Sequence, residues 1–163
     1  SGEIVVRAPW LTQGYLDNSE TSATLWRGDY LHTQDIGVKG PDGYLYITDR
    51  LKDVIKVAGE WVSSVEVENA LASVGGVKEV AVIGVPEARW GERPLALLVA
   101  DKDVFDEQIA RDHVRSCVSD GLISKHAVLT QFKLVDVIVK TSVGKIDKKA
   151  LRDEHLSARD HNS

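Results

Sequence analysis

The chain has 163 residues, of which 43% are hydrophobic and 28% are charged, and its 20 Lys and Arg against 25 Asp and Glu give a formal net charge of −5. This is the composition of a soluble globular protein, and the acidic balance argues against nucleic acid as the main partner. The single cysteine, Cys117, excludes an internal disulfide and fits a reducing compartment. No apolar run is long enough for a transmembrane helix.

The first block of the chain, up to about residue 50, is rich in strand patterns. Residues 4–7 predict a strand with no start signal before it, so we expect the chain to be a piece of a longer protein; a short native N-terminus is the alternative. Residues 30–38 and 44–48 flank Gly40-Pro41-Asp42-Gly43, a turn cluster typical of a β-hairpin. The polar stretch 17–21 predicts a loop with helix-capping chemistry.

After Arg50 the pattern becomes mixed α and β. Ser63-x-x-Glu66 is a capping box, and the apolar residues that follow it have helical spacing. The predicted elements of this block are, in chain order, a strand at 54–57, a helix from Ser63 to Val74, strands at 80–85 and 95–100, a helix from Asp106 to Gly121, a strand at 132–139 and a helix from Asp147 to Arg152.

These patterns predict an α+β protein with two blocks. A β-rich strip over residues 1–51 precedes a small domain over 52–152, in which helices flank a central three-stranded sheet. Residues 153–163 are polar and predict a flexible tail.

Two polar clusters in the first half of the chain have the chemistry of a nucleotide site. Asp35 ends a predicted strand, where a carboxylate can accept two hydrogen bonds from a vicinal diol such as ribose; a turn or cap aspartate is the alternative. Arg50, Lys52 and Lys56 lie in one charged run and have the charge to neutralise phosphate oxygens. The alternative for this run is a solvated linker.

A third cluster is the loop at 140–145, where Gly144 allows the backbone to bend and Lys145 points outward. Such a loop suits the approach of a phosphate, and a basic loop beside a helix is the alternative. Trp61 follows a predicted turn at Ala58-Gly59-Glu60, where a large ring has little core to enter. The five histidines lack metal-site spacing, so no metal centre is predicted.

Taken in order, these clusters resemble the C-terminal part of the adenylate-forming acyl-CoA synthetases, the superfamily that also contains firefly-type luciferases and peptide-synthetase adenylation domains. Residues 49–56, followed by Gly59-Glu60-Trp61-Val62-Ser63-Ser64, look most like the fatty acyl-CoA synthetase branch. Residues 2–15 are similar to the family's sixth core motif and 141–148 to its tenth, and Thr33-Gln34-Asp35 stands where the family has Thr-Gly-Asp. The resemblance covers about residues 2–152.

The resemblance implies that residues 52–152 are the C-terminal lid domain and 1–51 a strip of the large AMP-binding domain. It implies that Asp35 binds the ribose hydroxyls of ATP or AMP, and that Arg50 contacts ribose or phosphate. Lys52 would be the hinge on which the lid turns and would also bind the nucleotide.

For the lid itself, the resemblance implies that Lys145 is the catalytic lysine of adenylation. Lys56 would be a second catalytic residue, on the face used for thioester formation. Gly59 and Trp61 would lie in the loop beside the adenylate and the pantetheine tunnel, where Trp61 would also bind the nucleotide. Two residues depart from the family pattern: Gln34 replaces a glycine, which puts the local backbone course in question, and Val139 replaces a proline, which predicts a less stiff loop before Lys145.

The implied function is that of an ATP-dependent fatty acid–CoA ligase, which joins a carboxylic acid to coenzyme A through an acyl-adenylate, with Mg²⁺ accompanying ATP. The partner would be the protein's own large N-terminal domain, because the family's phosphate loop and acid pocket do not occur in these residues. We therefore expect this chain by itself to be inactive, and expect the whole protein in the cytoplasm, with peripheral attachment to a membrane as an alternative.

Two other functions remain open at this point. One is an adenylation domain whose thiol acceptor is a carrier protein, although no carrier domain follows in these residues. The other is a non-catalytic nucleotide-binding or interaction module, which the presence of Asp35, Lys52 and Lys145 disfavours. The sequence predicts neither the acyl chain length nor the oligomeric state.

Overall fold

The computed structural model describes the backbone of residues 1–160 and the side chains of residues 1–155. The chain divides into two compact units, Ser1–Lys52 and Asp53–Ser163. This division falls beside the boundary expected between residues 51 and 52. Among the described residues, no helix is long and apolar enough to cross a membrane.

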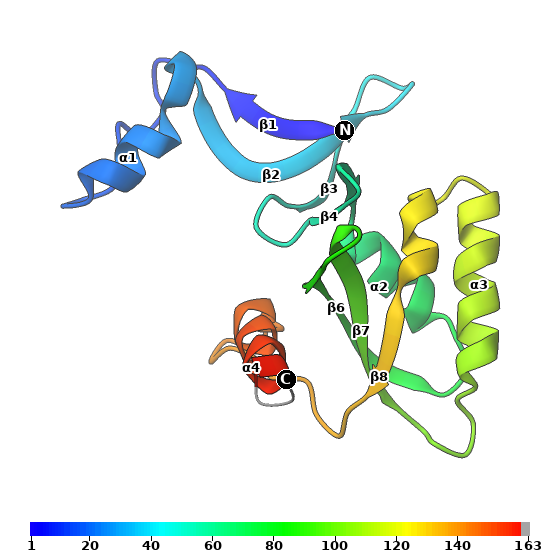
Figure 1. The fold of residues 1–163 in the computed structure, drawn as a ribbon. Coiled ribbons are helices and arrows are strands. Elements are labelled where there is room, and N and C mark those ends of the chain that lie inside the picture. Colours follow the sequence, from blue (N-terminus) through cyan, green and yellow to red (C-terminus); the bar gives the residue numbers. More distant parts are fainter. Residues whose placement is uncertain (161–163) are drawn as a thin grey trace. The chain divides into compact units, whose positions relative to one another are not determined.

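The first unit is an antiparallel sheet in the order β1-β2-β3, formed by β1 (Gly2–Val6), β2 (Leu31–Lys39) and β3 (Leu45–Arg50) (Figure 1). The expected hairpin is confirmed, and Gly43 takes a φ of 86° in its turn, a conformation that glycine adopts without strain. The polar loop carries a short helix, α1 (Ser19–Leu25), because the Asn18 side chain accepts a hydrogen bond from the backbone of Thr21. A 3₁₀ turn, η1 (Arg27–Asp29), leads into β2.

The second unit contains a five-stranded sheet rather than the expected three-stranded one. Its strands are β4 (Ile55–Val57), β5 (Glu60–Val62), β6 (Val77–Glu87), β7 (Gly91–Ala100) and β8 (Gln131–Leu134). Their order is β5-β4-β7-β6, and β8 pairs with β7 in parallel.

The expected number of strands in the sheet was wrong for two reasons. All four strands predicted in this block belong to the same sheet, and β4 forms a hairpin with an additional strand, β5, through a two-residue turn. Ala58 and Gly59 both have positive φ, 51° and 82°, as the tightest hairpin turns require. In the sequence the pair looks like the end of a strand, and the capping box at Ser63 follows too closely to leave an obvious second strand. β8 is also shorter than expected, ending at Leu134 instead of Val139.

Helices cover both faces of this sheet. α2 (Ser64–Ala72), α3 (Glu107–Ser119) and the 3₁₀ turn η2 (Lys125–Leu129) lie on one side, and α4 (Lys148–Asp160) lies on the other (Figure 1). The expected cap at Ser63 is confirmed, since its side chain accepts from the backbone N–H of Glu66. Asp106 caps α3 in the same way, because its side chain accepts from the backbone N–H groups of Gln108 and Ile109. α4 continues beyond Arg152 to Asp160, through part of the expected flexible tail; residues 161–163 lie outside the described residues.

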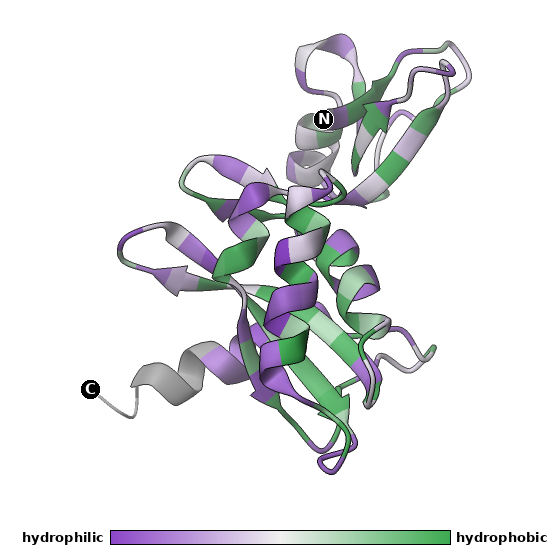
Figure 2. Cartoon of the chain, turned by 90° about the vertical axis from the view of Figure 1, so that its right-hand side faces the viewer, coloured by the Kyte–Doolittle hydropathy of each residue, from purple (hydrophilic) through white to green (hydrophobic). Residues whose placement is uncertain are grey.

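The core of the second unit follows the two-residue period of its strands. On β6, Val82 packs into the cluster under α2 and α3, whereas its neighbours Ala81 and Ile83 pack into the cluster that includes Leu151 of α4. The strands are mainly hydrophobic and the outer faces of the helices hydrophilic (Figure 2). Because both faces of the sheet are covered, β6 and β7 are continuous apolar runs, as the sequence indicates.

Candidate active site

In the first unit, the two residues expected to contact ribose lie side by side. Asp35 on β2 and Arg50 on β3 are cross-strand partners, and Arg50 Nη1 lies 3.0 Å from Asp35 Oδ1. The Asp35 side chain is 26% exposed and that of Arg50 57%. The carboxylate is therefore oriented by a guanidinium while its remaining acceptor sites are open to solvent, as a ligand with a vicinal diol requires.

The backbone before Asp35 has the conformation that a glycine would favour, although the residue is Gln34, with a φ of 63°. Thr33 Oγ1 donates to the Ile4 carbonyl at 2.8 Å and accepts from the Asp35 N–H at 3.1 Å. The Gln34 carbonyl accepts from the Leu51 N–H at 2.8 Å. Gln34 thus adopts the left-handed backbone conformation that a glycine would favour at this position, and the hydrogen bonds around it are made.

The expected hinge lies where the first unit ends. Lys52 is exposed, within a turn at residues 51–53. Asp53, the first residue of the second unit, is held by Arg152 of α4, with Arg152 Nη1 at 3.0 Å from Asp53 Oδ1. The side chains of this pair are only 23% and 13% exposed. This ion pair ties Asp53 to α4 at the start of the second unit, whereas Lys52 is the last residue of the first unit.

The β4–β5 hairpin carries the residues expected for thioester formation. Lys56 and Trp61 are cross-strand partners, so their side chains project from the same face of the hairpin. Lys56 is exposed and Trp61 half-buried, and Gly59 is exposed at the turn. The hairpin is held on its β7 side, because Lys56 N–H donates to Glu92 Oε2 of β7 at 2.7 Å and Ala58 N–H to the Trp90 carbonyl at 2.8 Å.

The turn of this hairpin is also tied to η2. Glu60 Oε1 accepts from Lys125 Nζ at 2.7 Å, and Glu60 Oε2 lies 3.5 Å from His126 Nε2. The hydrogen bond from Lys125 is the main cause that lowers the pKa of Glu60, with smaller contributions from the nearby charges, against an opposing effect of burial.

Lys145 lies in a short loop that closes on itself. Residues Lys140 and Ile146 form a β-bridge, Thr141 N–H donates to the Lys145 carbonyl at 2.7 Å, and Asp147 N–H donates to the Val139 carbonyl at 2.9 Å. Gly144 has a φ of 80° at the bend. The Lys145 side chain is exposed, as expected. The backbone hydrogen bonds hold this loop although it lacks the family's proline.

Directly after this loop, α4 is anchored to the body of the second unit. Lys148 Nζ lies 2.8 Å from Glu68 Oε1 and donates to Ser64 Oγ at 2.7 Å, so it ties α4 to α2. Glu68 Oε1 also accepts from the Val82 N–H of β6 at 2.7 Å. Lys148 and Glu68 are 12% and 15% exposed. The base of the Lys145 loop is therefore fixed by a largely buried charge pair.

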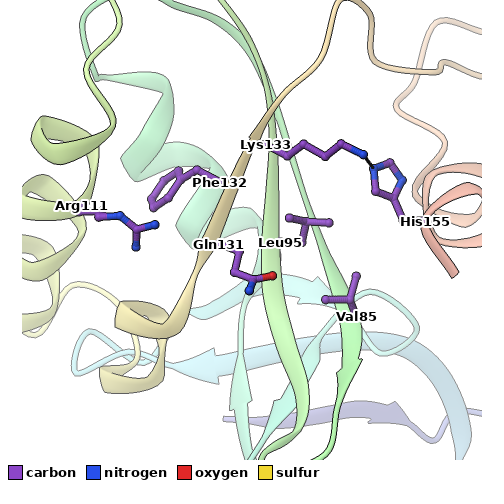
Figure 3. Close-up of a pocket in the computed structure, with 7 residues that line it drawn as sticks. All are labelled: Val85, Leu95, Arg111, Gln131, Phe132, Lys133 and His155. Atoms are coloured by element: carbon purple, nitrogen blue, oxygen red, sulfur yellow. Dashed lines mark hydrogen bonds between the residues drawn. The ribbon is translucent and has the colours of Figure 1, made fainter. Parts of the chain in front are cut away.

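A groove of about 440 Å³ lies elsewhere, around the edge strand β8 (Figure 3). Phe132 points from one face of β8 toward Arg111, whereas Gln131 and Lys133 point from the other, where Lys133 Nζ lies 3.2 Å from His155 Nε2 (Figure 3). None of the predicted site residues lines it. In the described part of the chain, no group of three or more His, Cys, Asp and Glu side chains is placed to hold a metal ion.

Sequence reasoning missed the residues that hold the predicted ones in place, chiefly Glu3, Glu68, Lys125 and Lys148. Each acts on a residue far away in the chain, as Lys125 does on Glu60, so local patterns carry no signal for it. Glu3 and Lys148 lie within the stretches similar to the sixth and tenth motifs, which is the signal that could have pointed to them.

The chain is similar to known proteins over most of its length. Residues 66–145 match the family "AMP-binding enzyme C-terminal domain". The long-chain-fatty-acid–CoA ligase of Thermus thermophilus is 39% identical over 155 residues, covering 94% of this chain and 28% of the relative. The 2-succinylbenzoate–CoA ligase of Listeria monocytogenes (strain F2365) is 33% identical over 154 residues, covering 94% of this chain and 32% of the relative.

Solved structures give the same family. The ATP-bound MatB of Rhodopseudomonas palustris has a TM-score of 0.77 at 31% identity, over 94% of this chain and 30% of that one. A fatty acyl CoA synthetase of Mycobacterium tuberculosis has a TM-score of 0.67 at 34% identity, over 96% of this chain and 30% of that one. The chain belongs to the AMP-binding, adenylate-forming enzymes, as the C-terminal part of one. It spans 28% and 32% of the length of the two curated relatives above.

Proposed function

We propose that the chain is the nucleotide-binding edge and the lid of an ATP-dependent acid–CoA ligase. The observation that carries this proposal is the placement of Lys145: its side chain is exposed, on a loop held by hydrogen bonds and followed by an anchored helix. A lysine in such a position can present a cation at a site outside its own domain without any loss of packing.

In the first half-reaction, a carboxylate oxygen of the acid attacks the α-phosphorus of ATP, forming acyl-AMP and releasing pyrophosphate. Two anions must meet in this step, and the Lys145 ammonium offsets their repulsion more strongly where water is excluded. Asp35 accepts hydrogen bonds from the ribose hydroxyls, and Arg50 both orients Asp35 and faces the nucleotide. Mg²⁺ would accompany the phosphates of ATP.

In the second half-reaction, the sulfur of CoA attacks the acyl carbon of the adenylate, forming the thioester and releasing AMP. The exposed face of the β4–β5 hairpin, with Lys56, Trp61 and the turn at Gly59, is proposed to line the path of the pantetheine arm. One lid serves both steps if it turns about Lys52, which is exposed and precedes the residue that Arg152 holds.

For the acid, we propose a fatty acid. The support is the run at residues 49–56 and the 39% identity with a long-chain-fatty-acid–CoA ligase. Other relatives are named as a 2-succinylbenzoate–CoA ligase and a 3-methylmercaptopropionyl-CoA ligase, and one similar structure is an amide bond synthetase, so the test below compares several acids.

The partner of the first unit is proposed to be the remainder of the large domain. Tyr44, Leu45 and Ile47 on and beside β3 are 72%, 55% and 66% exposed, which leaves an apolar strip for that domain to cover. The chain by itself would then lack the acid pocket and be inactive.

The test uses the full-length enzyme and measures pyrophosphate exchange into ATP with fatty acids of increasing length and with 2-succinylbenzoate. We expect exchange with fatty acids, and a drop of about 10²–10³ in the Lys145→Ala variant. Lys149→Ala, which removes an exposed lysine on the first turn of α4, is the matched control and should retain exchange. Absence of exchange with every acid, or an equal loss in both variants, would contradict the proposal.

A further inference from the structure

One carboxylate in the first unit holds the residues on both sides of Thr33. Glu3 on β1 lies with its Oε2 2.8 Å from His32 Nδ1. Its Oε1 accepts from both the backbone N–H and the side-chain amide of Gln34, each at 3.3 Å. The side chains of His32 and Glu3 are 12% and 14% exposed, so this cluster is largely shielded from water.

The contact matters most for Gln34, which immediately precedes Asp35. A residue with a side chain seldom adopts a φ of 63°, because its Cβ crowds the backbone there. The two hydrogen bonds from Gln34 to Glu3 offset that cost. The same residue accepts from Leu51 N–H through its carbonyl, next to Arg50, so its conformation affects both ends of the Asp35–Arg50 pair.

His32 fixes the orientation of Glu3. Its Nε2 lies 2.9 Å from the Arg27 carbonyl and its Nδ1 faces Glu3, so both ring nitrogens have acceptors, which suits the doubly protonated ring. The hydrogen bond to Glu3, and next the one to the Arg27 carbonyl, raise the pKa of His32, against opposing effects of burial and of the Arg27 charge. The charged groups around the ring are thus Glu3 from β1 and Arg27 from η1.

We infer that Glu3, paired with His32, is a positioning residue that sets the backbone at Gln34 and thereby directs the Asp35 carboxylate at the ribose of the nucleotide. This inference rests on the proposed nucleotide-binding role of Asp35. Its consequence is that nucleotide affinity depends on an ion pair that never touches the nucleotide, and weakens as His32 loses its proton.

The test compares KM for ATP with kcat in the full-length enzyme. Glu3→Gln keeps the size of the side chain but removes the charge, and we expect it to raise KM for ATP about tenfold while kcat changes less than about twofold. In the parent enzyme, KM for ATP should rise as the pH passes above the pKa of His32. That rise should be absent in Glu3→Gln, whose KM is already high at low pH.

A matched pair at Gln34 tests the backbone without altering the ion pair. Gln34→Gly takes the positive φ freely and should leave KM for ATP within about twofold of the parent value. Gln34→Val disfavours that φ and should raise KM several-fold, on the order of the Glu3→Gln effect. If Glu3→Gln fails to fold, the two Gln34 variants provide the test. An unchanged KM for ATP in Gln34→Val overturns the inference.

Asp35→Asn separates this inference from the proposed function. If Asp35→Asn leaves KM for ATP unchanged, the nucleotide role of Asp35 is wrong and the inference fails with it. If Asp35→Asn raises KM but Glu3→Gln and Gln34→Val do not, Asp35 binds the nucleotide and the positioning role of Glu3 alone is refuted.

Discussion

Replacing Lys148 with methionine removes the charge pair that anchors the helix after the Lys145 loop. At 2.8 Å, two unit charges attract by about 6 kcal/mol at an effective dielectric constant of ~20. Desolvation offsets most of that gain, and the two side chains are still 12% and 15% exposed. We therefore expect a net coupling free energy of about 1–3 kcal/mol between Lys148 and Glu68.

The assay is a double-mutant cycle in urea unfolding of the 163-residue chain. Lys148→Met keeps the aliphatic stem, and Glu68→Gln keeps an oxygen for the Val82 N–H. We expect Lys148→Met alone to cost about 2–3 kcal/mol, because Glu68 stays largely buried without this ammonium. Lys149→Met, on the same turn of α4, should change the free energy of unfolding by less than about 0.5 kcal/mol.

The result that refutes this reasoning is additivity. If the double variant loses the sum of the two single losses, Lys148 and Glu68 do not stabilise one another, and the base of the Lys145 loop is not fixed by their charges. A loss of unfolding free energy in Lys149→Met as large as that in Lys148→Met would also contradict this reasoning, because the effect would then not depend on the pairing with Glu68.

Three further outcomes are expected. Lys52→Pro fixes φ at the proposed hinge, so thioester formation from supplied acyl-AMP should fall at least about tenfold in the full-length enzyme; a normal rate sinks the hinge assignment. Leu71→Ala, at a fully buried site, should cost about 2–5 kcal/mol in urea unfolding, and a loss under about 1 kcal/mol would show that the core under α2 is loosely packed. The pKa of Glu60 is lowered in the folded state, so its pairing with Lys125 stabilises the fold above the ordinary pKa of 4.5. This stabilisation is lost as the pH falls through the lowered value. In thermal unfolding, the melting temperature of Glu60→Gln should therefore fall less on acidification than that of the parent chain.

The parts of the fold that the sequence predicts are those set by nearby residues. Ser63 caps α2 as expected, because a cap needs only the next two or three residues. The apolar runs of β6 and β7 are recognisable because both faces of those strands are covered. The hairpin that adds β5 was missed because its turn, Ala58-Gly59, resembles the end of a strand.

At the candidate site, residue types and exposure could be predicted, but not the contacts that hold them. The exposed side chain of Lys145 follows from its position after Gly144 in a polar loop. The pairing of Gln34 with Glu3 spans 31 positions, and that of Lys148 with Ser64 spans 84. Such contacts depend on how strands and helices pack, which no periodicity in one sequence encodes.

The central claim is that one lid presents Lys145 in the first half-reaction and the Lys56 face in the second. Single-turnover rates of both half-reactions in the full-length enzyme test it most directly. The account predicts opposite defects: Lys145→Ala slows acyl-AMP formation and spares the transfer of supplied acyl-AMP to CoA, whereas Lys56→Ala slows the transfer and spares adenylation. Equal slowing of both half-reactions in either variant would contradict it.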